Sequence, residues 1–183
     1  MRYIVFSSAD PKDLLMIGTR ALILYTQNGA LYLMDMKTFE IRKIANHLSW
    51  NTHTGVRAMR SPNGKKTYFK LAESLGVINV STLQIERYMG SGIVSTVRLS
   101  PDGKGFVWPV HNPNYREGKG VYVMNEDGSE IRRIASIEDL YELTQNKDEF
   151  KPEDMEVQHP KWSPDGKYIL YNSAQFGHSQ LYI

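Results

Sequence analysis

Apolar and polar residues alternate with a period of two along many short segments of this chain, a pattern typical of β-strands with one face turned toward a core. β-Branched and aromatic residues are common in the same segments, as expected for strands. The clearest group of four predicted strands covers residues 94–100, 105–110, 120–126 and 131–135. The pattern therefore predicts an all-β protein built from short antiparallel strands.

One turn sequence recurs between the predicted strands. Ser-Pro-Asp-Gly-Lys occupies residues 100–104 and 163–167, and Ser-Pro-Asn-Gly-Lys occupies residues 61–65. Proline presets φ for the first central position of a turn, Asp or Asn bonds the backbone ahead, and glycine adopts the left-handed conformation. We interpret these segments as tight hairpin turns and not as sites of catalytic serine or aspartate.

The recurring turn divides the chain into units of similar organisation. Once two insertions, residues 112–119 and 137–156, are set aside, the spacing approaches the roughly 40–45 residues of a propeller blade. The predicted blades cover residues 14–45, 55–90, 94–135 and 157–183. We predict a single β-propeller domain over residues 1–183, with about four four-stranded antiparallel blades. An immunoglobulin-like sandwich is the alternative, but it does not predict the same turn in successive units.

The last predicted blade is one strand short, which leaves more than one arrangement open. Residues 2–6 would close a four-bladed ring if they supplied the missing outer strand. Alternatively, the rest of a longer chain or a second copy completes a larger propeller, because unpaired strand edges invite further pairing. We favour the larger propeller.

The composition of the chain excludes several classes of protein. Its 183 residues are 41% hydrophobic and 23% charged, as in ordinary globular proteins, and it has no apolar run of the roughly 20 residues that a membrane-spanning helix needs. The net charge is +2 without a basic stripe, so we expect neither membrane insertion nor a nucleic-acid partner. The absence of cysteine excludes disulfides and thiolate zinc sites but suits both cytoplasm and periplasm.

Propeller geometry sorts the histidines and the two insertions by face. The loop that enters a blade and the loop between its second and third strands lie on the same face of a propeller. By their sequence positions, both insertions and all five histidines map to that face: His47, His53, His111, His159 and His178. Because long loops usually carry function, we expect this insertion-bearing face to bind the ligand.

Some residues of this face are candidates for a metal site. Histidine is the commonest metal ligand, and His111 and His159 are expected at strand ends, where Gln158 could add an oxygen ligand. These three residues form our candidate site for manganese or another divalent metal, and no other cofactor is indicated. The alternative is that the histidines are polar loop residues without a ligand, since no HExxH or comparable spaced pair occurs.

Two further features belong to the same face. Trp50 lies in an expected loop, where its ring could stack on a sugar, and His53 and His178 are candidate ligand-binding residues on the same face. The insertion at 137–156 is rich in Asp and Glu. We interpret it as a solvated acidic loop with a short helical turn over residues 137–143, because the Asp-x-Asp-x-Asp-Gly order of a calcium loop is missing.

The later part of the chain resembles a known repeat. Residues 97–104, 121–129 and 159–171 are similar to the WD-like repeats of the TolB type, and the resemblance covers residues 94–183. Proteins with such repeats include periplasmic binding scaffolds, the gating domain of prolyl-oligopeptidase-type peptidases and oligogalacturonate lyases. The resemblance therefore implies a propeller but leaves the chemistry undecided.

The likeness to oligogalacturonate lyases centres on the third predicted blade. It implies that His111 is a manganese ligand and that Arg116 or Lys119 contacts a uronate carboxylate. The later ligand motif of that family is matched only loosely by Gln158 and His159, and Lys161 stands where a further histidine is expected. β-Elimination also needs a base for the C5 proton, and the sequence offers no candidate for it.

The leading hypothesis is a binding or scaffolding surface for a protein or an oligosaccharide on the insertion-bearing face. The alternative is a metal-dependent polysaccharide lyase of the oligogalacturonate lyase type. A third possibility is the gating propeller of a prolyl-oligopeptidase-type peptidase. The chain has no Gly-x-Ser-x-Gly nucleophile elbow of its own.

Overall fold

A computed structural model gives the fold of the chain. It describes residues 14–17, 21–25, 31–35, 37–45, 58–71, 74–82, 84–89, 96–143, 151–175 and 178–183. The chain divides into two compact units, residues 1–88 and 89–183, and each is described by itself below. That the two form one domain stays a prediction.

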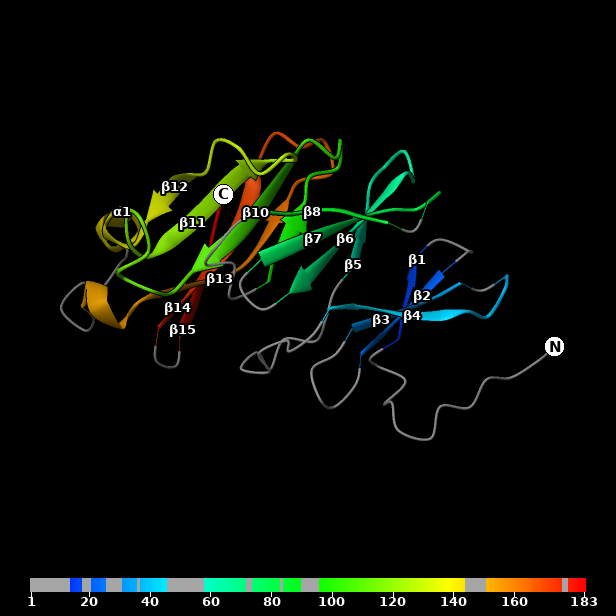
Figure 1. Cartoon of the computed structure of the whole chain (residues 1–183). Coiled ribbons are helices and arrows are strands. Elements are labelled where there is room, and N and C mark those ends of the chain that lie inside the picture. The colour runs from blue at the N-terminus through cyan, green and yellow to red at the C-terminus, as the bar shows by residue number, and fades with distance from the viewer. Residues whose placement is uncertain are drawn as a thin grey trace. The chain divides into compact units, whose positions relative to one another are not determined.

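The first unit contains two antiparallel sheets, each with its strands in chain order (Figure 1). The first sheet consists of β1 (Leu14–Ile17), β2 (Ala21–Tyr25), β3 (Leu31–Asp35) and β4 (Ile41–Ala45). The second consists of β5 (Ala58–Arg60), β6 (Lys66–Leu71), β7 (Ser74–Asn79) and β8 (Ile85–Met89). Hydrophobic residues at the centre of β6 and β7, such as Phe69 and Val77, are fully buried.

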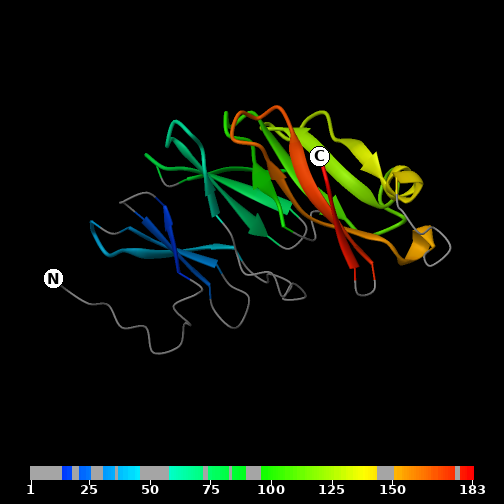
Figure 2. The ribbon, with the colours of Figure 1, turned by 180° about the vertical axis from the view of Figure 1, so that it is seen from behind.

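The second unit contains a four-stranded and a three-stranded antiparallel sheet, which lie side by side in both views (Figures 1 and 2). The first consists of β9 (Arg98–Leu99), β10 (Gly105–Val110), β11 (Gly120–Asn125) and β12 (Arg132–Ser136). The second consists of β13 (Glu156–Trp162), β14 (Ile169–Gln175) and β15 (His178–Tyr182). Between the sheets in sequence lie the helix α1 (Ile137–Leu143) and the 3-10 helix η3 (Pro152–Asp154).

The predicted all-β fold is confirmed, and two details of the prediction are wrong. Among the described residues of the first strand expected at 94–100, only Arg98–Leu99 form a strand, β9. His159 does not open its strand but lies inside β13, where it has a φ of 51° at a register shift between Gln158 and Lys161. This irregularity is a β-bulge, which alternation of residue types does not reveal. No helix in the described part of the chain is long and apolar enough to cross a membrane.

The Ser-Pro-Asp-Gly segments form turns held by their own side chains. The Ser100 hydroxyl donates to the Asp102 carboxylate at 2.6 Å, and the Gly103 amide donates to the Ser100 carbonyl at 2.9 Å. The Ser100 hydrogen bond is the main reason that the pKa of Asp102 lies below its usual value. Ser163 and Asp165 repeat the 2.6 Å contact. The recurrent motif therefore closes hairpins, as predicted.

One hydrophobic core joins the two sheets of the second unit to the long insertion. Val107 of β10 and Val121 of β11 share a cluster with Val157 of β13. Buried side chains from the insertion complete this cluster: Ile137, Leu140 and Met155. The expected helical turn is confirmed as α1, but the insertion is not simply a solvated acidic loop. Its apolar residues anchor both of its described ends in the core.

We predict that Gly120→Ala destabilises the second unit. Gly120 opens β11, and a Cβ there would collide with the carbonyl oxygen of Ala135 and would lie 2.9 Å from Cδ of Arg133. Overpacking of this kind costs about 1–3 kcal/mol. The control is Gly105→Ala at the start of β10, whose added Cβ would meet its nearest neighbour, the Met124 carbonyl oxygen, at 3.0 Å. Urea unfolding should show a larger loss for Gly120→Ala, and equal losses would contradict this packing.

Candidate functional site

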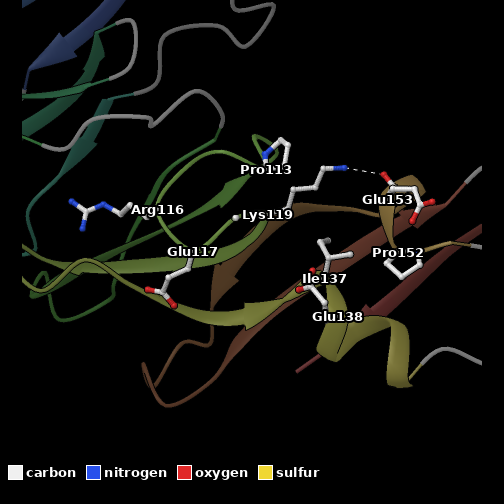
Figure 3. Close-up of a pocket in the computed structure, with 9 residues that line it drawn as sticks. Pro113, Arg116, Glu117, Lys119, Ile137, Glu138, Pro152 and Glu153 are labelled. Carbon is white, nitrogen blue, oxygen red and sulfur yellow. Dashed lines mark hydrogen bonds between the residues drawn. The ribbon is translucent and has the colours of Figure 1, made fainter.

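An open pocket of about 590 Å³ lies between the two insertions of the second unit (Figure 3). The loop after β10 supplies one side, and the start of α1 together with η3 supplies the other. The lining residues are Pro113, Arg116, Glu117, Gly118, Lys119, Ile137, Glu138, Pro152 and Glu153. The structure thus brings together two segments that are well separated in the chain, and it places the predicted ligand-binding residues Arg116 and Lys119 at the pocket.

Hydrogen bonds and ring contacts shape the loop between β10 and β11. The Tyr115 amide donates to the Asn112 carbonyl at 3.2 Å, and the Asn114 amide donates to the Asn112 side chain at 2.9 Å. The Tyr122 hydroxyl of β11 donates to the Gly118 carbonyl at 2.8 Å. The ring of Tyr115 also meets Tyr122 edge to face, with centroids 5.3 Å apart. The loop therefore has a defined shape, tied to the sheet at Tyr122.

Arg133 of β12 links this loop to the helix α1. Its Nη1 donates to the Lys119 carbonyl at 3.3 Å and lies 3.9 Å from a carboxylate oxygen of Glu138. Its Nε lies 3.9 Å from a carboxylate oxygen of Glu117. One guanidinium with several donors in a fixed plane can hold partners in different directions at once. Arg133 therefore forms one polar connection between the two sides of the pocket, and it was not among the residues predicted from the sequence.

Lys119 makes a second connection across the pocket. Its Nζ donates to the backbone carbonyl of Glu153 at 2.9 Å, as the dashed line in Figure 3 shows. This bond joins the loop after β10 to η3. Because the acceptor is a neutral backbone carbonyl, this contact is a hydrogen bond and not an ion pair.

The start of α1 is fixed by a capping box. The Asp139 amide donates to the Ser136 hydroxyl oxygen at 2.9 Å, and the Ser136 amide donates to the Asp139 carboxylate at 3.1 Å. This reciprocal pairing satisfies backbone donors at the helix start. The Ser136 hydroxyl also donates to the Asp139 carboxylate, and this bond is the main reason that the pKa of Asp139 lies below its usual value. The cap holds the helical side of the pocket in place.

Arg116 is the exposed cation of the pocket. It has a φ of 38°, a conformation that is uncommon for residues other than glycine. Its guanidinium carbon lies 5.9 Å from the centroid of the Tyr115 ring, within the range of a cation–π contact. In Figure 3 its side chain points away from that of Lys119. The two cations therefore do not converge on one point, and the pocket presents them separately.

The candidate metal ligand His111 follows β10 directly. Its Nδ1 is buried without a hydrogen-bond partner and lies 3.9 Å from a carboxylate oxygen of Glu156. Burial lowers the pKa of His111 below its usual value, Lys119 adds to this effect, and Glu156 opposes it. Gln158 approaches the same carboxylate group, with 3.4 Å between its Nε2 and Glu156 Oε2. Glu156 is thus the shared neighbour of two predicted ligands.

The metal role of His111, Gln158 and His159 stays a prediction. No group of three or more His, Asp or Glu side chains in the described part of the chain lies close enough together to hold a metal ion. His159 is exposed on the bulge of β13. His178 was expected in a loop, but it is the first residue of β15 and pairs with Gln175. Trp50 and His53 lie outside the described residues, so their roles stay predictions, as does that of the metal.

We predict that Arg133→Gln loosens the loop between β10 and β11. Loss of its hydrogen bond and its two ion pairs should lower the free energy of local opening by about 1 kcal/mol, which makes amide exchange in residues 112–119 about fivefold faster. Arg132→Gln is the control, because Arg132 is exposed on the same strand. Hydrogen exchange measured by mass spectrometry distinguishes the two variants. Equal protection in Arg133→Gln and the parent chain would contradict the role of Arg133.

We also predict that His111 makes stability depend on pH. Because its pKa is lowered in the folded chain, the unfolded chain binds the proton first as the pH falls below the ordinary histidine value of about 6.5. His111 therefore contributes stability that is present above that value and is lost as the pH falls toward the folded pKa. Urea unfolding between pH 7.5 and 5 should show a steeper loss for the parent chain than for His111→Gln. Identical pH profiles would contradict this assignment.

Comparisons with known proteins support the fold and go no further. The sequence matches no protein-family profile and no curated protein. Hydrazine synthase of Kuenenia stuttgartiensis is 18% identical, with a TM-score of 0.50 over 84% of this chain and 40% of that chain. The β-propeller domain of Cps50 (Swd1) from Myceliophteria thermophila is 10% identical, with a TM-score of 0.58 over 92% of this chain and 50% of that chain.

The predicted β-propeller fold is confirmed by the similarity to the Cps50 domain. At these identities the similarity concerns the fold alone, because one fold hosts many functions. The TolB type and the oligogalacturonate lyase resemblance receive no support from these comparisons. The chain spans half or less of the length of both solved structures.

Proposed function

We propose that the chain is a propeller segment whose insertion-bearing face binds a protein partner. The observation that carries this proposal is the pocket between the two insertions. Arg133 and Lys119 hold both sides of this pocket through contacts between chain segments that are distant in sequence. A surface held in this way loses little conformational freedom on binding, which favours affinity.

The chemistry of the pocket favours a protein as the ligand. Arg116 and Tyr115 stand together on one loop, and arginine and tyrosine are enriched among the residues that dominate protein interfaces. Pro113, Pro152 and Ile137 add apolar surface beside the charged groups. A mixture of apolar surface with charges of both signs suits a folded or extended protein segment.

The other hypotheses have no specific observation in their favour. A metal-dependent lyase needs a cation on the uronate carboxylate, and the described residues contain no group of three His, Asp or Glu side chains for it. Trp50, the candidate for stacking on a sugar, lies outside the described residues. The gating role rests on the repeat resemblance alone. Protein binding is therefore the function that the geometry supports best.

We predict that a photo-crosslinker on the pocket loop captures the partner. p-Benzoylphenylalanine replaces Asn114, which is exposed on the loop after β10, and in a control chain it replaces Lys104, which is exposed in a Ser-Pro-Asp-Gly turn. Crosslinking in cells of the source organism, followed by mass spectrometry, should identify a protein attached at position 114 and not at 104. Equal labelling at both positions would contradict a binding face at the pocket.

The partner is then purified and titrated against the chain. Arg133→Gln should weaken binding several-fold, because the loop must be ordered again on binding, whereas Arg132→Gln should leave it unchanged. If the partner binds both variants with the affinity of the parent chain, binding does not depend on the pocket geometry.

A further inference from the structure

The pocket between the two insertions contains a cation that the surrounding residues leave unmatched. Arg116 is exposed in the lining, and no carboxylate in the described part of the chain forms an ion pair with its guanidinium. The contact that the structure gives this group is with the Tyr115 ring, whose centroid lies 5.9 Å from the guanidinium carbon. A cation–π contact orients a guanidinium without neutralising its charge. Arg116 therefore offers a positive charge to an outside group.

The backbone also supports a binding role for this side chain. Arg116 has a φ of 38°, a conformation that costs free energy in a residue with a Cβ, and such residues cluster at binding and active sites. The loop is tied to the sheet by the Tyr122 hydroxyl, which donates to the Gly118 carbonyl at 2.8 Å. The guanidinium is thus presented from a loop of defined shape, which reduces the conformational freedom lost on binding.

The other side of the pocket contains an unmatched carboxylate. Glu153 of η3 is exposed and lines the pocket. Its backbone carbonyl accepts the hydrogen bond from Lys119, but its carboxylate forms no ion pair with a cation among the described residues. The other two carboxylates of the lining, those of Glu117 and Glu138, each lie 3.9 Å from a nitrogen of Arg133. The free negative charge of the described lining is therefore that of Glu153.

The two unmatched charges define the chemistry of a ligand. Figure 3 shows Arg116 and Glu153 at opposite ends of the group of lining residues. We propose that the pocket recognises an extended protein segment with an acidic side chain for Arg116 and a basic side chain for Glu153, a proposal that rests on the protein-binding function of this pocket. Arginine suits a carboxylate because two of its N–H groups can donate to the two oxygens in parallel. Pro113 and Pro152 offer apolar surface to the rest of the segment.

Other anionic ligands fit this geometry less well. Phosphate groups are typically held by clusters of cations, whereas the side chains of Arg116 and Lys119 point away from each other in Figure 3. A nucleic acid would bring its phosphates close to the carboxylates of Glu138 and Glu153 in the same pocket and would be repelled by them. A segment with charges of both signs satisfies both ends of the pocket at once.

The test uses synthetic linear peptides that differ only in the charges at two positions, which flank a short spacer of proline and leucine. The charge pairs are acidic with basic in both orders, acidic with acidic, and basic with basic, and each pair is made with several spacer lengths. Affinities for the 183-residue chain are measured by fluorescence anisotropy. A mixed peptide should bind tightest, and each lost ion pair should weaken binding about fivefold. Equal affinity for all charge pairs would overturn the inference.

Charge-reversal variants show which residue recognises which end of the peptide. Arg116→Glu should shift the preference to peptides with two basic residues, and Glu153→Lys should shift it to peptides with two acidic residues. Glu153→Gln, which removes the charge alone, should only weaken the preference for a basic residue. The control is Arg132→Glu, because Arg132 is exposed on β12 but does not line the pocket, and circular dichroism checks that each variant is folded. Unchanged preferences in both reversal variants, or the same shift in Arg132→Glu, would overturn the assignment.

Amide NMR signals show whether the tightest peptide occupies the pocket. The signals of residues 113–119 and 151–153 should shift when the peptide is added, and those of the turn at residues 100–104 should not. If every charge pair shifts the pocket signals with equal affinity, the inference is overturned and the protein-binding function stands. If no peptide shifts them, the inference is also overturned, and capture at position 114 decides the protein-binding function by itself.

Discussion

The second unit depends on one shared hydrophobic core. Its members come from β10, β11 and β13 and from both described ends of the long insertion, where Ile137, Leu140 and Met155 are buried. Burial of each such side chain is worth roughly 1.5–3 kcal/mol, so the insertion cannot leave the sheets without a large loss of stability. A segment that is acidic by composition is thereby fixed next to the loop after β10. The pocket follows from this packing.

Polar contacts then set the shape of the pocket between the two insertions. Arg133 and Lys119 each reach from one chain segment to another, and in both cases a backbone carbonyl accepts the hydrogen bond. Individually these contacts are weak because they lie near solvent. Their importance is geometric, since they decide how the loop with Arg116 faces α1 and η3. Core packing positions the insertions, and the polar links give the binding surface its form.

The sequence was a good guide to features that depend on local chemistry. Strand alternation, the Ser-Pro-Asp-Gly turns and the helical turn at Ile137–Leu143 all follow from neighbouring residues, and the structure confirms them. The position of His159 on a bulge and the approach of His111 to Glu156 depend on register and packing between sheets. Arg133 was missed for the same reason, because its partners lie on other elements. Its place on a strand near two insertions was the only available signal.

The two insertions meet across the pocket, and a spin label on one of them tests this contact directly. Because the chain has no cysteine, a single cysteine introduced at Asn114 can carry a nitroxide label, and its effect on amide NMR signals reports proximity. We expect broadening of the signals of Glu153 and Met155, with no such effect from a label at Asp102 in the Ser-Pro-Asp-Gly turn. Full intensity for residues 151–155, while the loop around position 114 is broadened, would contradict the account.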